Sequence, residues 1–171
     1  MAGTINAPTT VDPDVDTPAP HRRRRRVLTL IAALAAVLTL SGVLTSCETT
    51  AQDRQLAIDL INLSRGQNGV RPVVANGQLN TKADAWASQM RDRCQISHSR
   101  LADGAPSGWQ KLGENVGRGG NISQVHVAYL NSPGHRRNIL DPAFNQVGAA
   151  AVYGTCNGHR MVFTVQVFMR G

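Results

Sequence analysis

The stretch from Arg160 to Met169 constrains the fold more than any other part of the chain. Its apolar residues alternate at a period of two and share one face: Met161, Phe163, Val165, Val167 and Met169. Thr164 and Gln166 point the other way, and such alternation predicts a β-strand. The Asn157-Gly158 pair before it is typical of a hairpin turn, and residues 147–153 are apolar and β-compatible. A C-terminal β-hairpin is therefore expected.

Helical patterns precede this hairpin. Apolar residues at helical spacing predict helices over about 49–67, 78–93 and 122–130. We assign Trp86 to the core-facing stripe of the second helix, and we expect His126 at a surface or boundary position of the third. Because the helices come first and the hairpin last, the pattern favours an α+β domain with helices packed against an antiparallel sheet.

The N-terminal third indicates export. Residues 1–26 form a polar region that we interpret as disordered, and it ends in the run Arg22 to Arg26. An apolar run of 18 residues follows, Val27 to Leu44. Positive charges before an apolar run are typical of an export segment, and this length is marginal for a transmembrane helix. We therefore divide the chain into 1–26, a signal, lipoprotein or membrane-anchor segment at 27–46, and a folded domain at 47–171.

The sequence Leu44-Thr45-Ser46-Cys47 resembles a bacterial lipobox, in which the cysteine is lipidated and becomes the new N-terminus. An uncleaved anchor and ordinary secretion are the alternatives. In each case the domain works outside the cytoplasm, at the membrane, at the cell surface or as a secreted protein.

The other two cysteines, Cys94 and Cys156, are expected to form a disulfide, since an oxidising compartment favours pairing. Such a bridge would contribute on the order of 3 to 4 kcal/mol of stability by the loop-entropy model. Two unpaired buried thiols are the alternative.

Basic charge does not point to nucleic acid here. The formal net charge is +7, but five of the positive charges are the single arginine run. Residues 47–171 carry 13 Lys/Arg and 8 Asp/Glu, a net +5, and these charges are scattered without interleaved aromatics. We expect no nucleic-acid partner, a modest attraction to anionic envelope polymers or lipid headgroups, and a monomeric protein.

The stretch S-P-G-H-R-R-N-I-L, from Ser132 to Leu140, has the pattern of a helix start. Ser132 can cap the helix, and Pro133 suits its first position. His135 then falls in the first turn, where Ile139 and Leu140 would anchor the turn to a core. The pattern predicts a histidine held at a defined position.

Two more polar residues lie in short segments between regular elements. His98 lies in I-S-H-S, and Glu114 lies in the glycine-bracketed G-E-N-V-G, which we interpret as a brief strand. Together with His135 they form a familiar ligand set for zinc, with one position left for water. The alternative is a polar cleft in which Glu114 accepts backbone N–H bonds and the two histidines form hydrogen bonds.

The three motifs I-S-H-S, G-E-N-V and S-P-G-H-R-R-N-I-L, in this order, resemble the bacterial CAP superfamily of cysteine-rich secretory, antigen 5 and pathogenesis-related proteins. The resemblance covers about Ala51 to Gly171. It implies a three-layer α-β-α sandwich, with helices on both faces of a small antiparallel sheet and a cleft between them.

The resemblance also implies site residues. The family's cleft holds two histidines and two glutamates, and some members bind zinc or other divalent cations there. By motif, His98, Glu114 and His135 match the first histidine, the first glutamate and the second histidine, and Gln166 in V-Q-V-F joins the cleft. The second glutamate has no counterpart, which removes a ligand and a candidate general base.

Three functions follow as hypotheses. The favoured one is a non-catalytic extracytoplasmic module that binds a lipid, a cell-envelope glycan or a protein. The alternative is a metal-dependent, protease-like hydrolase, with His98 and His135 on zinc and Glu114 as ligand or base. A purely structural envelope protein is the third.

Overall fold

The computed structural model describes Thr49 and residues 51–171, so the export segment and Cys47 lie outside the described residues. The elements in chain order are α2 (Ala51–Gln67), β1 (Val74–Ala75), α3 (Gly77–Asp92), β2 (Lys111–Gly119), α4 (Ile122–Asn131), α5 (Pro133–Leu140), β3 (Gln146–Cys156) and β4 (His159–Arg170). Every helix in this part of the chain is too short or too polar to cross a membrane.

The four strands form one sheet in the order β1-β3-β4-β2. The predicted hairpin is present as β3 and β4, joined by Asn157 and Gly158 with positive φ angles of 52° and 78°. β2 pairs antiparallel with β4 along nine residues, so the predicted brief strand at G-E-N-V-G is longer than expected. The short β1 pairs parallel with β3, which makes the sheet mixed rather than purely antiparallel.

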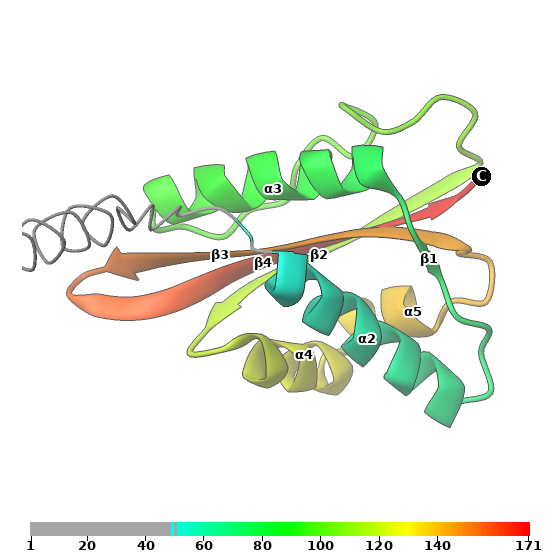
Figure 1. Cartoon of the computed structure of the whole chain (residues 1–171), viewed down its shortest axis with the longest axis horizontal. Helices are drawn as coiled ribbons and strands as arrows, with labels where there is room; N and C mark the ends of the chain where they lie inside the picture. Colours follow the sequence, from blue (N-terminus) through cyan, green and yellow to red (C-terminus); the bar gives the residue numbers. More distant parts are fainter. Residues whose placement is uncertain (1–48, 50) are drawn as a thin grey trace, which may run out of the picture. The chain divides into compact units, whose positions relative to one another are not determined.

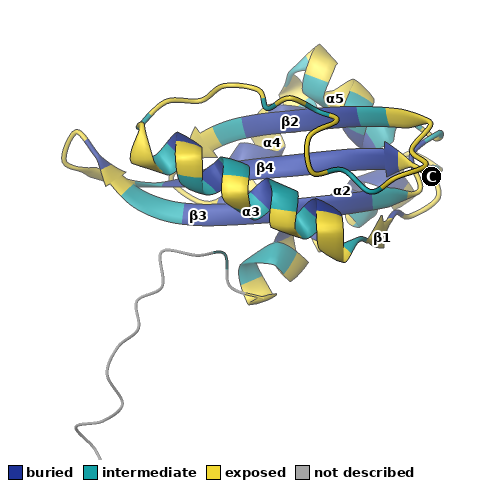
Figure 2. Cartoon of the chain, turned by 90° about the horizontal axis from the view of Figure 1, so that it is seen from above, coloured by how far each residue is buried: buried dark blue, intermediate teal, exposed yellow. Residues whose placement is uncertain are grey.

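Helices cover both faces of this sheet. α3 lies alone on one face, and α2, α4 and α5 lie on the other (Figure 1). β4 is buried along most of its length between β3 and β2 (Figure 2). The predicted three-layer α-β-α sandwich is confirmed.

The alternation in β4 explains the two layers of core. Phe163, Val165 and Val167 pack with the apolar stripe of α3. Thr164 points to the opposite face, where its hydroxyl meets the Tyr129 hydroxyl of α4 at 2.7 Å. Alternate residues of β4 therefore pack into two different cores, one on each face of the sheet.

Arg65 of α2 ties the loops at one end of the domain together. Its side chain is fully buried and donates hydrogen bonds to the backbone carbonyls of Arg71, Ile139, Asp141 and Phe144. Burial lowers the pKa of this guanidinium. Three of these carbonyls lie in loops and that of Ile139 lies in the last turn of α5, and all four accept hydrogen bonds from this one side chain.

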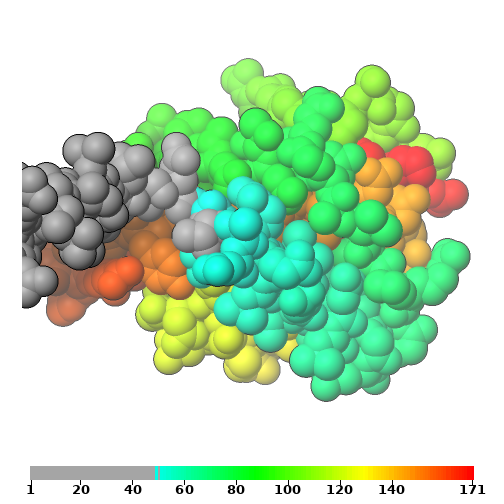
Figure 3. Space-filling view, viewed as in Figure 1, coloured from blue at the N-terminus to red at the C-terminus, as the bar shows by residue number. Residues whose placement is uncertain are grey.

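The two helix layers also meet directly at the margin of the sheet. Arg54 of α2 donates to Asp84 of α3 at 2.5 Å, and α2 lies beside α3 in the space-filling view (Figure 3). The Arg54 Nε also donates to the carbonyl of Ala149 in β3. Arg54 therefore links α2 to α3 through Asp84 and to β3 through the Ala149 carbonyl.

The expected disulfide is confirmed. Cys94, just after α3, is bonded to Cys156 at the end of β3, across a sequence separation of 62 residues. By the loop-entropy model, closing a loop of this length contributes about 4 kcal/mol. The bridge fixes the end of α3 to the hairpin.

Two details differ from the expectations. Ser132 is the N-cap residue of α5, as expected, but its side chain makes no cap hydrogen bond. His126, expected near the surface, is only 6% exposed, because its Nε2 lies 2.8 Å from the Ser64 hydroxyl of α2. A polar side chain beside an apolar stripe can be buried when a residue of the facing helix forms a hydrogen bond with it.

Gly148 of β3 permits the closest approach between helix and sheet. A Cβ atom at this position would lie 2.1 Å from the backbone carbonyl carbon of Leu79 in α3. We expect Gly148→Ala to lower the free energy of unfolding by about 2 kcal/mol, because the helix backbone must move away. Urea denaturation measures this change. Gly66→Ala in α2 is the control, since nothing apart from its chain neighbours and its own helix backbone lies within 4 Å of its Cβ position. Equal effects of the two substitutions would contradict the explanation.

The buried His126 predicts a stability loss in acid. Burial lowers the pKa of His126 in the folded state, so the unfolded state binds a proton more readily near pH 6.5. Stability should therefore fall as pH drops below the unfolded pKa. The pKa of His135 is lowered too and acts in the same direction. We expect the pH dependence of unfolding between pH 7.5 and 5 to be shallower in His126→Gln; an unchanged slope would contradict a role for His126.

Candidate functional site

Glu114 of β2 holds the irregular segment that follows α3. Its side chain is 1% exposed, and its carboxylate accepts three hydrogen bonds. His98 Nδ1 lies 2.8 Å from Oε1, the Ser99 backbone N–H donates to Oε1 at 2.9 Å, and the Ser99 hydroxyl donates to Oε2 at 2.5 Å. The carboxylate therefore binds two consecutive residues of this segment to the edge strand of the sheet.

A polar stripe on α3 holds the same segment from the other side. Gln78, Lys82 and Trp86 are spaced four residues apart, so they share one face of the helix. The Trp86 indole N–H donates to the Ser97 carbonyl at 2.7 Å, and the Lys82 amine donates to the carbonyls of Arg100 (2.9 Å) and Asp103 (2.7 Å). Gln78 makes a longer contact, 3.5 Å, to the Gly104 carbonyl.

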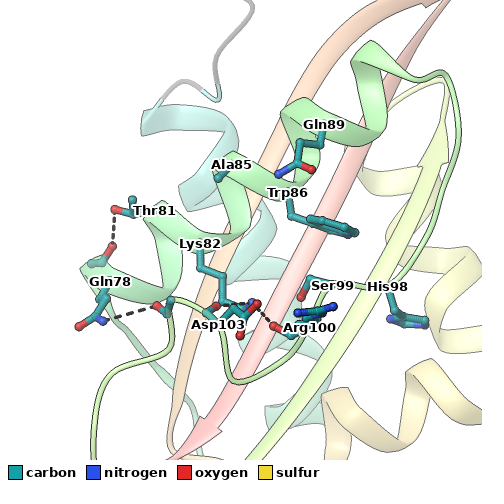
Figure 4. Close-up of a pocket in the computed structure, with 12 residues that line it drawn as sticks. Gln78, Thr81, Lys82, Ala85, Trp86, Gln89, His98, Ser99, Arg100 and Asp103 are labelled. Carbon is teal, nitrogen blue, oxygen red and sulfur yellow. Dashed lines mark hydrogen bonds between the residues drawn. The ribbon is translucent and has the colours of Figure 1, made fainter.

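A pocket of about 1060 Å³ lies between this stripe and residues 98–104. Figure 4 shows the Trp86 ring projecting from α3 over Ser99, with His98 at one edge of the pocket. The lining residues are Gly77, Gln78, Thr81, Lys82, Ala85, Trp86, Gln89, His98, Ser99, Arg100, Asp103 and Gly104. Partial burial lowers the pKa of the Lys82 amine, and the nearby carboxylates of Glu114 and Asp103 partly offset this effect.

The opposite face of β2 carries an amide network. Asn115 is fully buried and donates to Gln166 Oε1 at 3.0 Å and to the His135 carbonyl at 3.2 Å. Asn138 of α5 donates to Asn115 Oδ1 and to the Glu114 carbonyl. Gln166, predicted in the cleft, is 3% exposed and belongs to this network, which fixes α5 on the sheet.

His135 lies on this second face. Its ring packs against the Tyr129 ring with centroids 4.9 Å apart. Burial lowers the pKa of His135, and the charge of the nearby His98 lowers it further. The two histidines are therefore close enough to influence each other, although they come from different sides of β2.

The three predicted ligands do not form a metal-binding set. Within Thr49 and residues 51–171, no group of three or more His, Cys, Asp or Glu side chains is placed to hold a metal ion. Side chains of neighbouring strand residues point to opposite faces of the sheet. Glu114 points to the face that α3 covers, whereas His135 belongs to α5, which covers the other face. Glu114 is also engaged with His98 and Ser99. Cation binding through these residues stays a prediction.

Residues 58–168 match the Cysteine-rich secretory protein family, CAP. The chain belongs to the CAP family. The match covers all three sequence motifs and the four strands of the sheet except the last residues of β4. Each motif of this CAP domain has a place in the structure. I-S-H-S contains the residues that bind Glu114, G-E-N-V lies in β2, and S-P-G-H-R-R-N covers the N-cap and most of α5.

Two bacterial relatives and one bacterial protein of similar fold illustrate the similarity. The uncharacterized protein YkwD of Bacillus subtilis is 31% identical over 104 residues, which cover 56% of this chain and 40% of YkwD. An extracellular SCP-domain protein of Bacillus anthracis has a TM-score of 0.58 at 26% identity, covering 70% of this chain and 41% of that one. An outer surface protein of Borrelia burgdorferi has a TM-score of 0.63 at 18% identity, covering 71% of this chain and 94% of that one. This chain thus spans less than half the length of the two Bacillus relatives.

The pocket residues of α3 were missed in the sequence. Trp86 was assigned to the core-facing stripe; it is half-buried and packs against the core under α3, and it also lines the pocket. The pattern that could have revealed it is the stripe of Gln78, Lys82, Trp86 and Gln89, which repeats at helical spacing beside the apolar stripe. Polar residues on such a face are usually solvent-exposed, so the pattern alone does not indicate a pocket.

Removing the Glu114 carboxylate should release the segment it holds. We expect Glu114→Ala to lower the free energy of unfolding by about 2 kcal/mol, because charge-assisted hydrogen bonds are lost. Amide hydrogen exchange at Ser99 should increase. Glu114→Gln should restore part of the protection, and Asp103→Ala, which leaves the backbone contacts of Lys82 in place, should leave exchange at Ser99 unchanged. Normal protection of Ser99 in Glu114→Ala would contradict the anchoring role.

Proposed function

We propose that this protein is an extracytoplasmic CAP module that binds a cell-envelope ligand without transforming it. The ligand site is the pocket between α3 and residues 98–104. The observation that carries the proposal is the state of Glu114: its carboxylate is buried and accepts three hydrogen bonds that shape one wall of this pocket. A carboxylate held by three donors from one segment serves to build the wall of a binding site.

The size and make-up of the pocket support binding. Small-molecule sites in proteins commonly measure about 300 to 1,000 Å³ and combine apolar surface with a few polar groups. This pocket has a comparable volume, with Trp86 and Ala85 beside amide, hydroxyl and charged side chains. Lipid, glycan and protein ligands are the classes that the family resemblance implies.

Location outside the cytoplasm is part of the proposal. The arginine run and apolar segment before Cys47 predict export, and the disulfide suits an oxidising compartment. The Bacillus anthracis relative is described as extracellular, which supports the same location. We propose that Cys47 carries a lipid anchor and that the chain acts as a monomer beside the membrane.

The metal-dependent hydrolase is less well supported. Such an enzyme needs metal ligands and a separate general base. The described residues offer the pair His98 and Glu114 in direct contact, with His135 on the other side of β2. α4, which the structure describes in full, carries no carboxylate that could replace the missing second glutamate.

Filling the pocket should abolish ligand capture. Ala85 is exposed on α3 and lines the pocket, so Ala85→Trp should block it without disturbing the core. We expect native mass spectrometry of the full-length protein, purified from bacterial envelopes, to show a bound non-protein mass that Ala85→Trp lacks. Ala128→Trp, at an exposed position of α4, is the matched control and should retain the mass. If Ala85→Trp and Ala128→Trp retain equal amounts of the bound mass, the ligand binds outside this pocket.

Divalent cations should not stabilise the domain. Because no three-ligand set is formed among the described residues, we expect the melting temperature of the full-length protein to be the same with Zn²⁺ and with EDTA. The control is His135→Ala, which should respond to neither. A rise with Zn²⁺ that disappears in His135→Ala would establish the cation site and favour the hydrolase.

A further inference from the structure

The pocket has a fixed aromatic platform. The indole N–H of Trp86 is engaged with the Ser97 carbonyl at 2.7 Å, so the ring cannot rotate freely. The ring projects into the pocket between α3 and the segment that it holds (Figure 4). Part of the ring packs against the core between α3 and the sheet, and the part that faces the pocket is what remains for a ligand.

Apart from Trp86, most side chains that line the pocket end in polar groups, and several carry them on aliphatic stems. Ala85 is the one small aliphatic side chain among the lining residues, and the remaining side chains are amides, hydroxyls, an imidazole and charged groups. Gln78 and Gln89 lie at helical spacing on α3, on either side of Trp86 along the chain. A pocket for an acyl chain would instead need walls of aliphatic side chains that exclude water.

The charges in the pocket are of both signs. Lys82 and Arg100 contribute positive groups, and Asp103 contributes a carboxylate. The Lys82 amine already donates to two carbonyls and holds the wall in place. Such a mixture suits a ligand with many hydroxyl and amide groups better than it suits a single strong anion.

On the basis of these features, and resting on the proposed binding function, we propose that the ligand is an oligosaccharide of N-acetylated amino sugars. A sugar ring has an apolar C–H face that can stack on Trp86 and hydroxyls along its edge that can pair with the glutamines and Thr81. An acetamido group combines an amide with a methyl group, which matches glutamine side chains beside Ala85. The volume of about 1060 Å³ leaves room for more than one ring.

The test uses the full-length protein and the tetrasaccharide of N-acetylglucosamine. The chain has two tryptophans, so a Trp109→Phe background makes Trp86 the single tryptophan reporter. We expect the tetrasaccharide to change Trp86 fluorescence with saturation. Calorimetry of the wild type should give the same dissociation constant.

Two substitutions separate stacking from a merely structural role. Trp86→Phe and Trp86→Leu both lose the hydrogen bond to Ser97, but only phenylalanine keeps an aromatic face. We expect Trp86→Phe to bind the tetrasaccharide within about threefold of the wild type and Trp86→Leu to bind about tenfold more weakly, as loss of stacking predicts. Equal weakening in both variants would overturn the stacking role.

A lipid ligand is the competing outcome. Absence of saturable tetrasaccharide binding, together with a lipid mass that Ala85→Trp excludes, would overturn the glycan inference and leave the binding function intact. Absence of both tetrasaccharide binding and a pocket-dependent mass would overturn both proposals.

Discussion

The buried carboxylate of Glu114 is the interaction on which the α3 side of the domain depends. An ionised group in a protein interior needs hydrogen-bond partners, since it has lost the water that solvated it. Here the partners are His98 and Ser99, which belong to a segment without regular structure. Because the buried Glu114 carboxylate needs these donors, it holds the segment in a defined position over β2, the edge strand of the sheet. α3 completes the enclosure through Lys82 and Trp86, and the pocket exists because both sides hold the same backbone.

β2 links the two faces of the sheet at this point. Glu114 faces the α3 layer, and its neighbour Asn115 faces α5, as the pleat of a strand requires. Gly113 and Gly117 share the second face, where a Cβ atom would lie 2.9 Å from the nearest ring atoms of Phe144 and Tyr129, respectively. The glycines let helices approach the strand closely, while the polar residues between them secure both layers. A displacement of β2 would thus be felt in the pocket and in α5 together.

Much of the fold could be predicted because its determinants are local. The alternation in β4, the helical periodicities and the pair Asn157-Gly158 each depend on residues adjacent in sequence. What could not be predicted depends on contacts between distant segments. His126 is buried because Ser64 faces it from another helix, and Trp86 lines a pocket because the segment around Ser97 returns to its indole N–H. The parallel pairing of β1, only two residues long, follows from the approach of β3 and has no pattern of its own.

The motif residues have structural tasks that account for most of the family resemblance. Glu114 anchors a loop, Asn115 and Asn138 join β2 to α5, and none of these tasks needs a reaction or a metal. A chain can therefore keep these motifs and lack a second glutamate without losing the fold. The ring of His135 is different, because the sheet does not require an imidazole against Tyr129. Most of the other motif residues are explained by packing, and the pocket beside His98 is therefore the ligand site that we propose.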